Sequence, residues 1–465
     1  MASQEMRLER DSMGELEVPA NAYYGANSRR AELNFPISKL RFGRSFVKAI
    51  AQIKQSAAVV NLELGALDEE IASAIIVSAQ RVIDGEFDEE FVVDIFQTGS
   101  GTSTNMNANE VISNVAIEAL GGELGSRTPV HPNDHVNKGQ SSNDVIPTSI
   151  HLAAAGAIQD NLLPALKELE DSLRAKSEEF WGVVKTGRTH LQDATPIRLG
   201  QEFLGYTGQL ELAGARARTA LAELSVLALG GTAVGTGIGM HPEFSSRVIV
   251  RLRELTGLDL SETTNHFQAQ STLDAVVAAS GQLKSIAVGL LKIANDLRWL
   301  GSGPRAGIGE ITLPEVQPGS SIMPGKVNPV IAESVAMVSA QVIGNDATIA
   351  IAGQSGNFEL NVMMPVAAHN LLESIDLLST SAVNFAHQCV NGLEATGKGP
   401  EMVMQGLAIG TALAPIIGYD AAAGIAHEAS VSGENIREVA LRMTDLTEEQ
   451  LDEILEPLSM TEPKA

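Results

Sequence analysis

The stretch from residue 271 to residue 300 restricts the fold more than any other part of this chain. Its apolar side chains recur mostly at helical intervals, at Leu273, Val276, Val277, Leu283, Ala287, Leu290, Ala294 and Leu297. A helix of about 30 residues is about 45 Å long, which is more than a small domain needs. Its Ala and Gly residues allow neighbouring helices to approach closely. We therefore expect an extended bundle of long helices.

Several other segments have the same helical spacing. We expect helices over residues 46–64, 69–84, 89–96, 105–120, 144–155, 157–180, 199–229, 330–352 and 366–392. Aromatic residues make up only 4% of the chain, so a core of Ala, Leu, Val and Ile is expected, which favours a mainly α fold. A length of 465 residues predicts two or three folding units, with a boundary at the composition change at 396–400. Beyond it, Thr447 to Gln450 form a capping-box pattern that predicts the start of a short helix.

The chain is strongly acidic, with a formal net charge of -25. This charge disfavours binding to nucleic acid and to anionic membranes. It also repels small anions, so an anion site in this chain must carry its own positive charge. The single cysteine, Cys389, excludes an internal disulfide and an all-cysteine iron–sulfur cluster.

The beginning of the sequence is polar and charged, without the apolar stretch of a signal peptide. The longest apolar runs are interrupted by Gly, Asn or Lys before they reach the length of a membrane span. These features predict a soluble, cytoplasmic protein.

The segment 319–329 reads Gly-Ser-Ser-Ile-Met-Pro-Gly-Lys-Val-Asn-Pro and precedes an expected helix. Its glycines and prolines exclude a regular helix or a central strand. Such a loop can bring backbone N–H groups and one cation, Lys326, to a small anion. An ordinary connecting loop has the same composition. This stretch alone therefore leaves both interpretations open.

Residues 97–105 form a second polar loop, rich in Gly, Ser and Thr, at the start of an expected helix. Small residues with free N–H groups at a helix N-terminus can hold an anion. That helix contains Asn105, Asn107, Asn109 and Asn114, which indicates either buried hydrogen bonds or local capping. The glycine-rich segment 230–239 has no preceding strand in a βαβ unit and no P-loop lysine, so we expect a helix–helix connector there.

The histidines offer two positions of interest. His131 and His135 have the spacing of two zinc ligands on a helix, but Pro132 lies between them in loop-like surroundings, so a metal site is not expected. His190 lies in the polar segment 186–194, which interrupts the helical pattern, and its ring can exchange a proton near neutral pH. A purely structural role remains the simpler interpretation of its position.

The polar loops 97–105, 131–143, 186–194 and 318–329 share hydroxyl, amide and free N–H groups. If the fold brings them together, they form a site for a small polyanion, to which Lys326 supplies positive charge. Such a site suits the removal of a proton next to a carboxylate, because the bound carboxylate accepts the developing charge. The sequence has no Gly-x-Ser-x-Gly motif in a strand–turn–helix context.

Five stretches together resemble the fumarase/aspartase superfamily. They are QTGSGTSTNMNANEV at 97–111, HPNDHVNKGQSSNDVIPTSIH at 131–151, GRTHLQDATP at 187–196, GSGPRAGIGE at 301–310 and GSSIMPGKVNP at 319–329. With a similar opening at 7–26, the resemblance covers nearly the whole chain. Within the superfamily the sequence is similar to the class II, iron-independent fumarases. Aspartate ammonia-lyases typically have Ala at the position of Gly325, whereas His135 stands where some relatives have Asp.

The resemblance implies a mainly α, three-domain subunit with a central bundle of long helices. The implied domains are an N-terminal domain over 1–140, a helical bundle over 141–395 and a small C-terminal helical domain over 396–465. It also implies a homotetramer whose active sites are shared between subunits, which would explain why the polar loops are scattered along the sequence.

The resemblance further implies roles for single residues. Ser320 is the implied base that removes the C3 proton of malate, and His190 the partner that transfers a proton at the C2 oxygen through a water. Glu333 is the implied carboxylate that orients His190 or its neighbours. The implied dicarboxylate contacts are Ser100, Gly101, Thr102, Ser141, Ser142, Asn143, Thr189, Ser321, Lys326, Val327 and Asn328. A secondary anion site is implied at Arg127, His131, Pro132, Asn133 and Asp134.

The implied reaction is the reversible anti addition of water to fumarate, giving L-malate through an aci-carboxylate intermediate, as in the citric acid cycle. No metal or other cofactor is implied, and neither nucleic acid nor a membrane is an expected partner. The alternative is aspartate ammonia-lyase or another fumarate-releasing lyase of the same superfamily. A catalytically silent relative is a third possibility, which the intact Ser320, His190 and Lys326 oppose.

Overall fold

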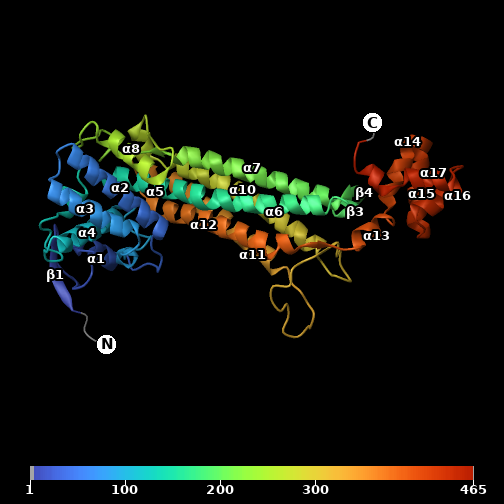
Figure 1. Cartoon of the computed structure of the whole chain (residues 1–465), viewed down its shortest axis with the longest axis horizontal. Coiled ribbons are helices and arrows are strands. Elements are labelled where there is room, and N and C mark those ends of the chain that lie inside the picture. The colour runs from blue at the N-terminus through green and yellow to red at the C-terminus, as the bar shows by residue number, and fades with distance from the viewer. Residues whose placement is uncertain (1–4, 464–465) are drawn as a thin grey trace. The chain divides into compact units, whose positions relative to one another are not determined.

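The computed structural model describes residues 5–463, and helices dominate this range (Figure 1). The helices are α1 (Ala26–Asn34), α2 (Arg44–Glu63), α3 (Glu69–Ile83), α4 (Thr102–Ala119), α5 (Ser142–Ala157), α6 (Leu163–Glu179), α7 (Leu199–Leu224), α8 (Phe244–Thr256), α9 (His266–Ser271), α10 (Asp274–Leu300), α11 (Val330–Gly353), α12 (Met364–Gln388), α13 (Lys398–Val403), α14 (Ala414–Ile417), α15 (Tyr419–Ser432), α16 (Ile436–Met443) and α17 (Glu448–Ile454). The prediction of a mainly α fold with several long helices is confirmed.

The strands are short and pair two by two. The antiparallel pairs are β1 (Met6–Asp11) with β2 (Gly14–Pro19), β3 (Val184–Thr189) with β4 (Gln192–Arg198), β7 (Ile311–Thr312) with β10 (Glu394–Ala395), and β8 (Gly356–Asn357) with β9 (Leu360–Asn361). The strands β5 (Val226–Leu227) and β6 (Ser261–Glu262) pair in parallel. Within residues 5–463 no sheet exceeds two strands, so the helices provide the core.

The helix expected over 89–96 is wrong, because only Asp88–Glu90 form a single 3-10 turn. The backbone N–H groups that follow it donate to side chains instead of to a helix. Val92 N donates to Asn107 Oδ1 at 3.1 Å, and Phe96 N donates to Asp94 Oδ1 at 2.8 Å. Side-chain acceptors thus replace the intrahelical carbonyls, as Asn and Asp often do.

The first of two compact units contains the described residues up to Pro164, together with Ala215–Ala287 and Ala340–Ser379. In it α2 packs against α3, α5 and α8. The buried face of α2 consists of Phe46, Ile50, Ile53, Ala57 and Val60, each with an exposed fraction of 0%. These are the residues whose helical spacing predicted this helix, so the prediction of its buried face is confirmed.

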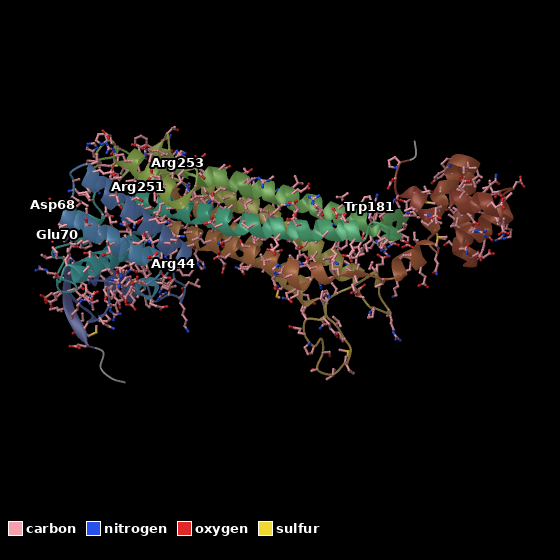
Figure 2. The ribbon with its side chains drawn as sticks, in the orientation of Figure 1. Arg44, Asp68, Glu70, Trp181, Arg251 and Arg253 are labelled. Carbon is pink, nitrogen blue, oxygen red and sulfur yellow. The ribbon has the colours of Figure 1, made fainter. Side chains whose placement is uncertain are left out.

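The outer faces of this unit are charged. Arg251 and Arg253 of α8 are exposed, whereas Leu252 between them is buried. Figure 2 shows these arginines, and Asp68 and Glu70 at the start of α3, projecting from the ribbon. Glu69 and Glu70 lie in the first turn of α3, where a negative charge stabilises the helix dipole.

The second unit contains Ala165–Gly214, Val288–Ser339 and the described residues from Thr380 onward. Its helical segments run side by side and are joined by polar contacts. Arg174 Nη2 of α6 donates to Glu211 Oε1 of α7 at 2.7 Å, and Tyr206 Oη of α7 donates to Asp296 Oδ2 of α10 at 3.0 Å. These contacts hold segments from distant parts of the sequence in one bundle.

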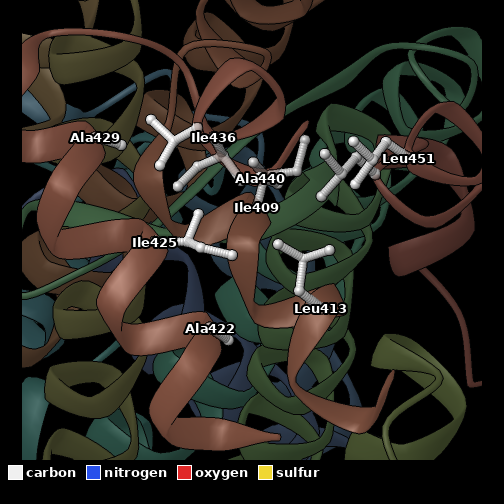
Figure 3. Close-up of a cluster of buried hydrophobic side chains, with 10 residues drawn as sticks. Ile409, Leu413, Ala422, Ile425, Ala429, Ile436, Ala440 and Leu451 are labelled. Atoms are coloured by element: carbon white, nitrogen blue, oxygen red, sulfur yellow. The ribbon is translucent and has the colours of Figure 1, made fainter. Parts of the chain in front are cut away.

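The C-terminal residues of this unit have an apolar cluster of their own (Figure 3). Its buried members are Ile409, Leu413, Ala422, Ile425, Ala429, Ile436, Val439, Ala440, Leu451 and Leu455. The predicted capping box is confirmed, since Thr447 Oγ1 accepts from Gln450 N and Gln450 Oε1 accepts from Thr447 N. The domain boundaries expected after residues 140 and 395 stay a prediction.

Two of the long helices, α10 and α11, are long and apolar enough to cross a membrane by length and composition alone. Polar residues interrupt their apolar runs, as expected from the sequence, yet the average over a helical window remains apolar. Their most apolar windows have a mean hydropathy of 1.4, and only 44% and 33% of the residues in these windows are buried within the chain. Much of their apolar surface is thus not covered by the chain itself.

Candidate active site

The loop 97–101 leads into α4 through two glycines at which a side chain is strongly disfavoured. A Cβ atom on Gly99 would lie 1.8 Å from the carbonyl oxygen of Val362. Gly101 is the residue before α4 and has a φ of 72°, in the left-handed region that favours glycine. These two residues fix the path of the loop, so that Thr102 begins the helix.

The start of α5 is fixed by a capping box. Ser141 Oγ accepts from Asn143 N at 3.2 Å, and Asp144 Oδ1 accepts from Ser141 N at 2.9 Å. The other oxygen of the buried Asp144 accepts from Gly230 N at 3.0 Å and Thr232 N at 2.9 Å. The segment 230–239 is a turn-rich connector, as predicted, and it anchors the α5 terminus.

Three predicted site residues from the two helix starts are joined by hydrogen bonds. The Thr102 hydroxyl is 2.8 Å from the Ser100 hydroxyl and 2.8 Å from the Ser142 hydroxyl. Asn143, one residue further, donates from Nδ2 to the carbonyl oxygen of Ala233 at 2.8 Å. The N-termini of α4 and α5 therefore present hydroxyl groups and backbone N–H groups side by side, an arrangement suited to an anion.

Sequence reasoning missed Lys54, which lies behind these two helix starts. Its ammonium group is fully buried and donates to Asn105 Oδ1 at 2.8 Å, Asn137 Oδ1 at 2.9 Å and Gln140 Oε1 at 2.9 Å. Burial lowers the pKa of Lys54 to about 7. A signal was present, because Lys54 interrupts the apolar face that predicted α2. Of the four asparagines that suggested buried hydrogen bonds, Asn105 is one that makes them.

The predicted polar segment 186–194 is a β-hairpin in the second unit. Thr189 pairs with Gln192 across its tip, and the two residues between them, His190 and Leu191, have φ values of 56° and 59°. Two successive residues of this kind form the tight turn that matches the twist of a hairpin. Non-glycine residues rarely adopt this conformation, and such strain is concentrated at functional sites. His190 and Thr189 are both exposed at this tip.

A buried ion cluster anchors the base of this hairpin, and sequence reasoning missed it as well. Arg188 donates two hydrogen bonds to Glu310, at 2.8 and 3.1 Å, and Glu310 is only 1% exposed. Lys185 Nζ lies 3.1 Å from Glu310 Oε2 and 2.7 Å from Glu202 Oε1. Burial raises the pKa of Glu202. The cluster thus links β3 to the motif at 301–310.

The loop between α10 and α11 extends from the helices as irregular chain (Figure 1). The Ser320 hydroxyl accepts from the backbone N–H groups of Ile322, at 3.3 Å, and Met323, at 3.1 Å. Lys326 Nζ donates to Asn328 Oδ1 at 2.9 Å, and Asn328 Nδ2 donates to Gly319 O at 2.6 Å. The loop is therefore closed on itself around a cavity of about 460 Å³.

Several predicted site residues in this loop point into solvent. Ser321, Lys326 and Val327 are exposed, and Ile322 is 83% exposed. Glu333 lies in the first turn of α11 and is half-buried. Within the described part of the chain, no hydrogen bond joins Ser320, His190 and Glu333 to one another.

The expected secondary anion site lies in the first unit. A cavity of about 660 Å³ is lined by Arg127 and Asn133 together with residues of the β1–β2 hairpin. Arg127 has a φ of 58°, and its Nη2 atom is buried without a hydrogen-bond partner. His131 Nδ1 accepts from Asn133 N and Asp134 N, at 3.2 and 3.1 Å, and Pro132 is buried beside it. Burial lowers the pKa of His135, whose Nδ1 accepts from His131 N at 2.9 Å.

The predicted site residues thus form separate groups. The first unit holds the linked hydroxyls of Ser100, Thr102 and Ser142, whereas the second holds the His190 hairpin and the Ser320 loop. Within residues 5–463 there is no group of three or more His, Cys, Asp or Glu side chains that could hold a metal ion. The long helices and these polar loops define a mainly α protein whose loops carry hydroxyl and N–H groups suited to a small anion.

Comparison with known proteins agrees with this class. A family model described as Lyase matches residues 14–344, and one described as Fumarase C C-terminus matches residues 409–462. The chain is 51% identical over 464 residues to a fumarate hydratase class II from Methylorubrum extorquens, covering 100% of this chain and 98% of that protein. It is 50% identical over 466 residues to the mitochondrial fumarate hydratase of Rhizopus oryzae, covering 100% and 94% respectively.

The solved structures lead to the same family. The fold is similar to the crystal structure of class II fumarase from Schistosoma mansoni, with a TM-score of 0.96 and 40% sequence identity, over 98% of this chain and 99% of that one. The chain belongs to the class II fumarate hydratase family. The resemblance stated from the five motifs is confirmed.

Proposed function

We propose that this chain catalyses the reversible hydration of fumarate to L-malate. The observation that carries the proposal is its 51% identity, over 464 residues, to a protein named fumarate hydratase class II. The same comparisons favour hydration over the ammonia-lyase alternative, in agreement with Gly325 in the loop. A citric acid cycle role accords with this reaction and is part of the proposal.

The dicarboxylate is held by hydroxyl, amide and N–H groups. The linked hydroxyls of Ser100, Thr102 and Ser142 support this role, because each can turn its proton either to its neighbour or to a bound carboxylate. Around them, the proposed contacts are Gly101, Ser141, Asn143, Thr189, Ser321, Lys326, Val327 and Asn328. Lys326 supplies positive charge in the loop that carries Ser320.

Ser320 acts as the base that removes the C3 proton of malate. A serine hydroxyl is a weak base unless its alkoxide is stabilised. The N–H groups of Ile322 and Met323 already donate to Ser320 Oγ, and both bonds strengthen when that oxygen carries a negative charge. This geometry supports Ser320 over the neighbouring Ser321.

His190 transfers the proton at the C2 oxygen through a water, and Glu333 orients it. The strained turn that carries His190 supports a functional role, because the left-handed conformation of a histidine persists only where the surrounding structure enforces it. Removal of the C3 proton of malate gives an aci-carboxylate, whose extra charge the carboxylate contacts stabilise, and the protonated C2 hydroxyl then leaves as water to give fumarate. Hydration is the reverse sequence, in which water adds to C2 and the proton returns to C3 on the opposite face.

The secondary anion site lies at Arg127, His131, Pro132, Asn133 and Asp134. The buried, unpartnered Nη2 of Arg127 beside a cavity supports it, because a buried guanidinium N–H without an acceptor costs free energy that a bound anion would recover.

Active sites are shared between the subunits of a homotetramer. The apolar surface of α10 and α11 supports assembly, since Val288 is 53% and Met337 is 68% exposed in the single chain. The exposure of Ile322 at the loop tip supports a shared site, because a second subunit would cover it.

The reaction proceeds without a metal ion, as in the iron-independent class that the sequence resembles, and the enzyme is cytoplasmic. Activity should therefore be unchanged after incubation with a chelator and gel filtration. A loss of activity that added divalent metal restores would contradict metal independence.

The function is tested by offering fumarate, L-malate, L-aspartate and argininosuccinate to the purified protein and following fumarate absorbance. We expect the protein to interconvert fumarate and malate and to leave L-aspartate and argininosuccinate unchanged. Formation of fumarate from aspartate but not from malate would overturn the proposal in favour of an ammonia-lyase.

A further inference from the structure

The first-unit part of the proposed site has an electrostatic problem. Residues 97–105 and 139–151 contain no Lys or Arg, yet the chain has a formal net charge of -25 and its ligand is a dianion. Asp144 adds a buried carboxylate at the start of α5. Partial charges at helix N-termini alone would have to outweigh these repulsions. A positive charge near these loops would remove the difficulty, and Lys54 is placed to provide it.

Lys54 contacts both helix starts. Asn105 lies in the first turns of α4, and Asn137 and Gln140 belong to the segment that ends at Ser141, the cap of α5. Asn61, two turns after Lys54 on the same face of α2, donates to the carbonyl oxygen of Lys138 at 3.0 Å. Helix α2 therefore holds the 137–140 segment at two points and joins it to α4.

If the only role of Lys54 were to donate hydrogen bonds to these amides, an uncharged donor would suffice. All three acceptors of Lys54 are uncharged amide oxygens, and the charged group that favours its ammonium form is Asp144. Burying an ammonium group without a direct carboxylate partner is costly. We infer that Lys54 is a positioning residue of the dicarboxylate site, which ties the α4 and α5 starts together and supplies a buried positive charge that stabilises the bound dianion.

This inference rests on the proposed function, because it assumes that Thr102 and its neighbours hold the dicarboxylate. It differs from the role of Lys326, which lies in an exposed loop. Lys54 itself has no free N–H, since its three protons are used by Asn105, Asn137 and Gln140. It therefore acts through the field of its charge and through the residues that it holds, without touching the substrate.

The inference predicts a link between binding and protonation. Burial lowers the pKa of Lys54 to about 7, so above this pH the free protein carries Lys54 largely neutral. A bound dianion favours the ammonium form and raises the pKa, so binding above pH 7 takes up a proton. Below pH 6 the group is charged in both states and no proton is taken up. Affinity for a dicarboxylate should consequently fall as pH rises above about 7.

Other titratable groups on elements packed against α2 need to be separated from Lys54. His135 on the Pro132–Val136 turn and His151 on α5 both have pKa values lowered by burial. Glu110 of α4 is bonded to Gly25, Asn27 and Ser28. Arg81 of α3 pairs with Glu86, and Arg247 of α8 pairs with Glu243. Both ion pairs lie at the surface. Burial raises the pKa of Asp144, and the charge of Lys54 opposes this shift. Removing Lys54 leaves the other groups in place, so the difference between variant and wild type reports Lys54 together with its effect on Asp144.

The experiment measures binding of succinate, a saturated dicarboxylate that cannot be hydrated, by calorimetry from pH 6 to 8.5. Buffers of different ionisation enthalpy report the number of protons taken up. Wild type should take up about 0.1 proton at pH 6 and about 0.4 proton at pH 8, because a tenfold effect on affinity corresponds to a pKa shift of about one unit. In K54M this uptake should disappear and affinity at pH 6 should fall about tenfold, the effect of roughly one charge interaction. K54Q, which keeps some donors without the charge, should show the same loss of proton uptake.

Two matched variants complete the design. K176M removes a lysine of α6 that is also buried, with an exposed fraction of 8%, but lies in the second unit, and should leave both affinity and uptake as in wild type. T102V removes a proposed contact and should weaken succinate binding while retaining the proton uptake at saturation.

The kinetic signature separates positioning from general damage. K54M should raise KM for fumarate about tenfold while kcat changes less than about threefold, because the charge stabilises substrate and transition state alike.

Wild type that takes up no proton at pH 8 overturns the inference without reference to any variant, even if K54M does not fold. Folded K54M with wild-type affinity and uptake also overturns it. If T102V binds succinate as tightly as wild type, the proposed dicarboxylate site is itself wrong. If T102V binds more weakly but K54M and K54Q behave as wild type, the site stands and only the role of Lys54 is wrong.

Discussion

At the scale of single residues, the proposed chemistry depends on a serine held by its own backbone. Ser320 Oγ receives two N–H bonds, from Ile322 and Met323, which favour its deprotonated form. Ser321 beside it is exposed to solvent. The two neighbouring serines thus differ in their surroundings, which makes them a matched pair for substitution.

Replacing Ser320 with Ala should lower kcat by about 10²–10⁴-fold, the usual contribution of a positioned general base. KM should change little, because Ser320 is not among the proposed carboxylate contacts. S321A, the control, should retain kcat within about tenfold and mainly raise KM. Initial rates with fumarate and with malate measure both effects, and S320A with wild-type kcat would remove Ser320 from the mechanism.

Residue roles were the least predictable feature from local sequence. Ser320, His190 and Lys326 attracted attention because they stand in helix-breaking polar loops. Lys54 and Glu310 did not, since a single charged residue beside apolar ones gives no indication of what it will face. Lys54 meets Asn105, Asn137 and Gln140 only because α2, α4 and α5 pack together.

At the scale of elements, the path of the loop into α4 depends on close backbone packing. A Cβ on Gly99 would meet the Val362 carbonyl oxygen at 1.8 Å, whereas a Cβ on Gly156 near the end of α5 would meet nothing within 4 Å. There is no room for a side chain at Gly99, whereas there is room for one at Gly156, and neither glycine has a positive φ.

We expect G99A to lower the free energy of unfolding by about 3 kcal/mol, because the backbone must shift to admit a methyl group. G156A should raise it by about 0.5–1 kcal/mol, since Ala loses less entropy than Gly in a helix. Urea-unfolding midpoints followed by circular dichroism provide the measurement. Equal stability of G99A and wild type would mean that the loop does not pack against Val362 as described.

The β3–β4 hairpin depends on the buried cluster around Glu310. E310Q removes the buried negative charge that Arg188 and Lys185 share, and places an amide NH₂ group next to one of these cations. The expected loss of unfolding free energy is about 3 kcal/mol, with a lower kcat because the His190 turn is displaced. E462Q removes the charge that pairs with Arg198, on a Glu462 side chain that is 60% exposed, and should cost less than about 1 kcal/mol. Similar losses in the two variants would contradict the anchoring role of Glu310.

At the scale of the whole molecule, sharing of active sites between subunits makes a quantitative prediction. S320A and N143D should each be inactive, the second because its carboxylate repels the substrate. If the two residues in one site come from different subunits, random mixing of the two variants restores both intact loops in about a quarter of the sites.

Activity of co-expressed variants, relative to wild type at equal protein concentration, measures this recovery. Mixing the purified variants without subunit exchange is the control and should stay inactive. No recovery after verified co-assembly would place both residues in the same subunit.

Local sequence determined the mainly α architecture and the position of most long helices, because helical periodicity and helix-breaking residues act over a few residues. The pattern at 271–300 thus predicted α10, and the composition of 318–329 predicted an irregular loop. The expected helix at 89–96 failed where a distant acceptor, Asn107 Oδ1, took the N–H of Val92. Tertiary structure alone decided that His190 sits in a strained hairpin turn and that one buried lysine joins two helix starts. Both depend on contacts between residues far apart in the chain, which no local pattern encodes.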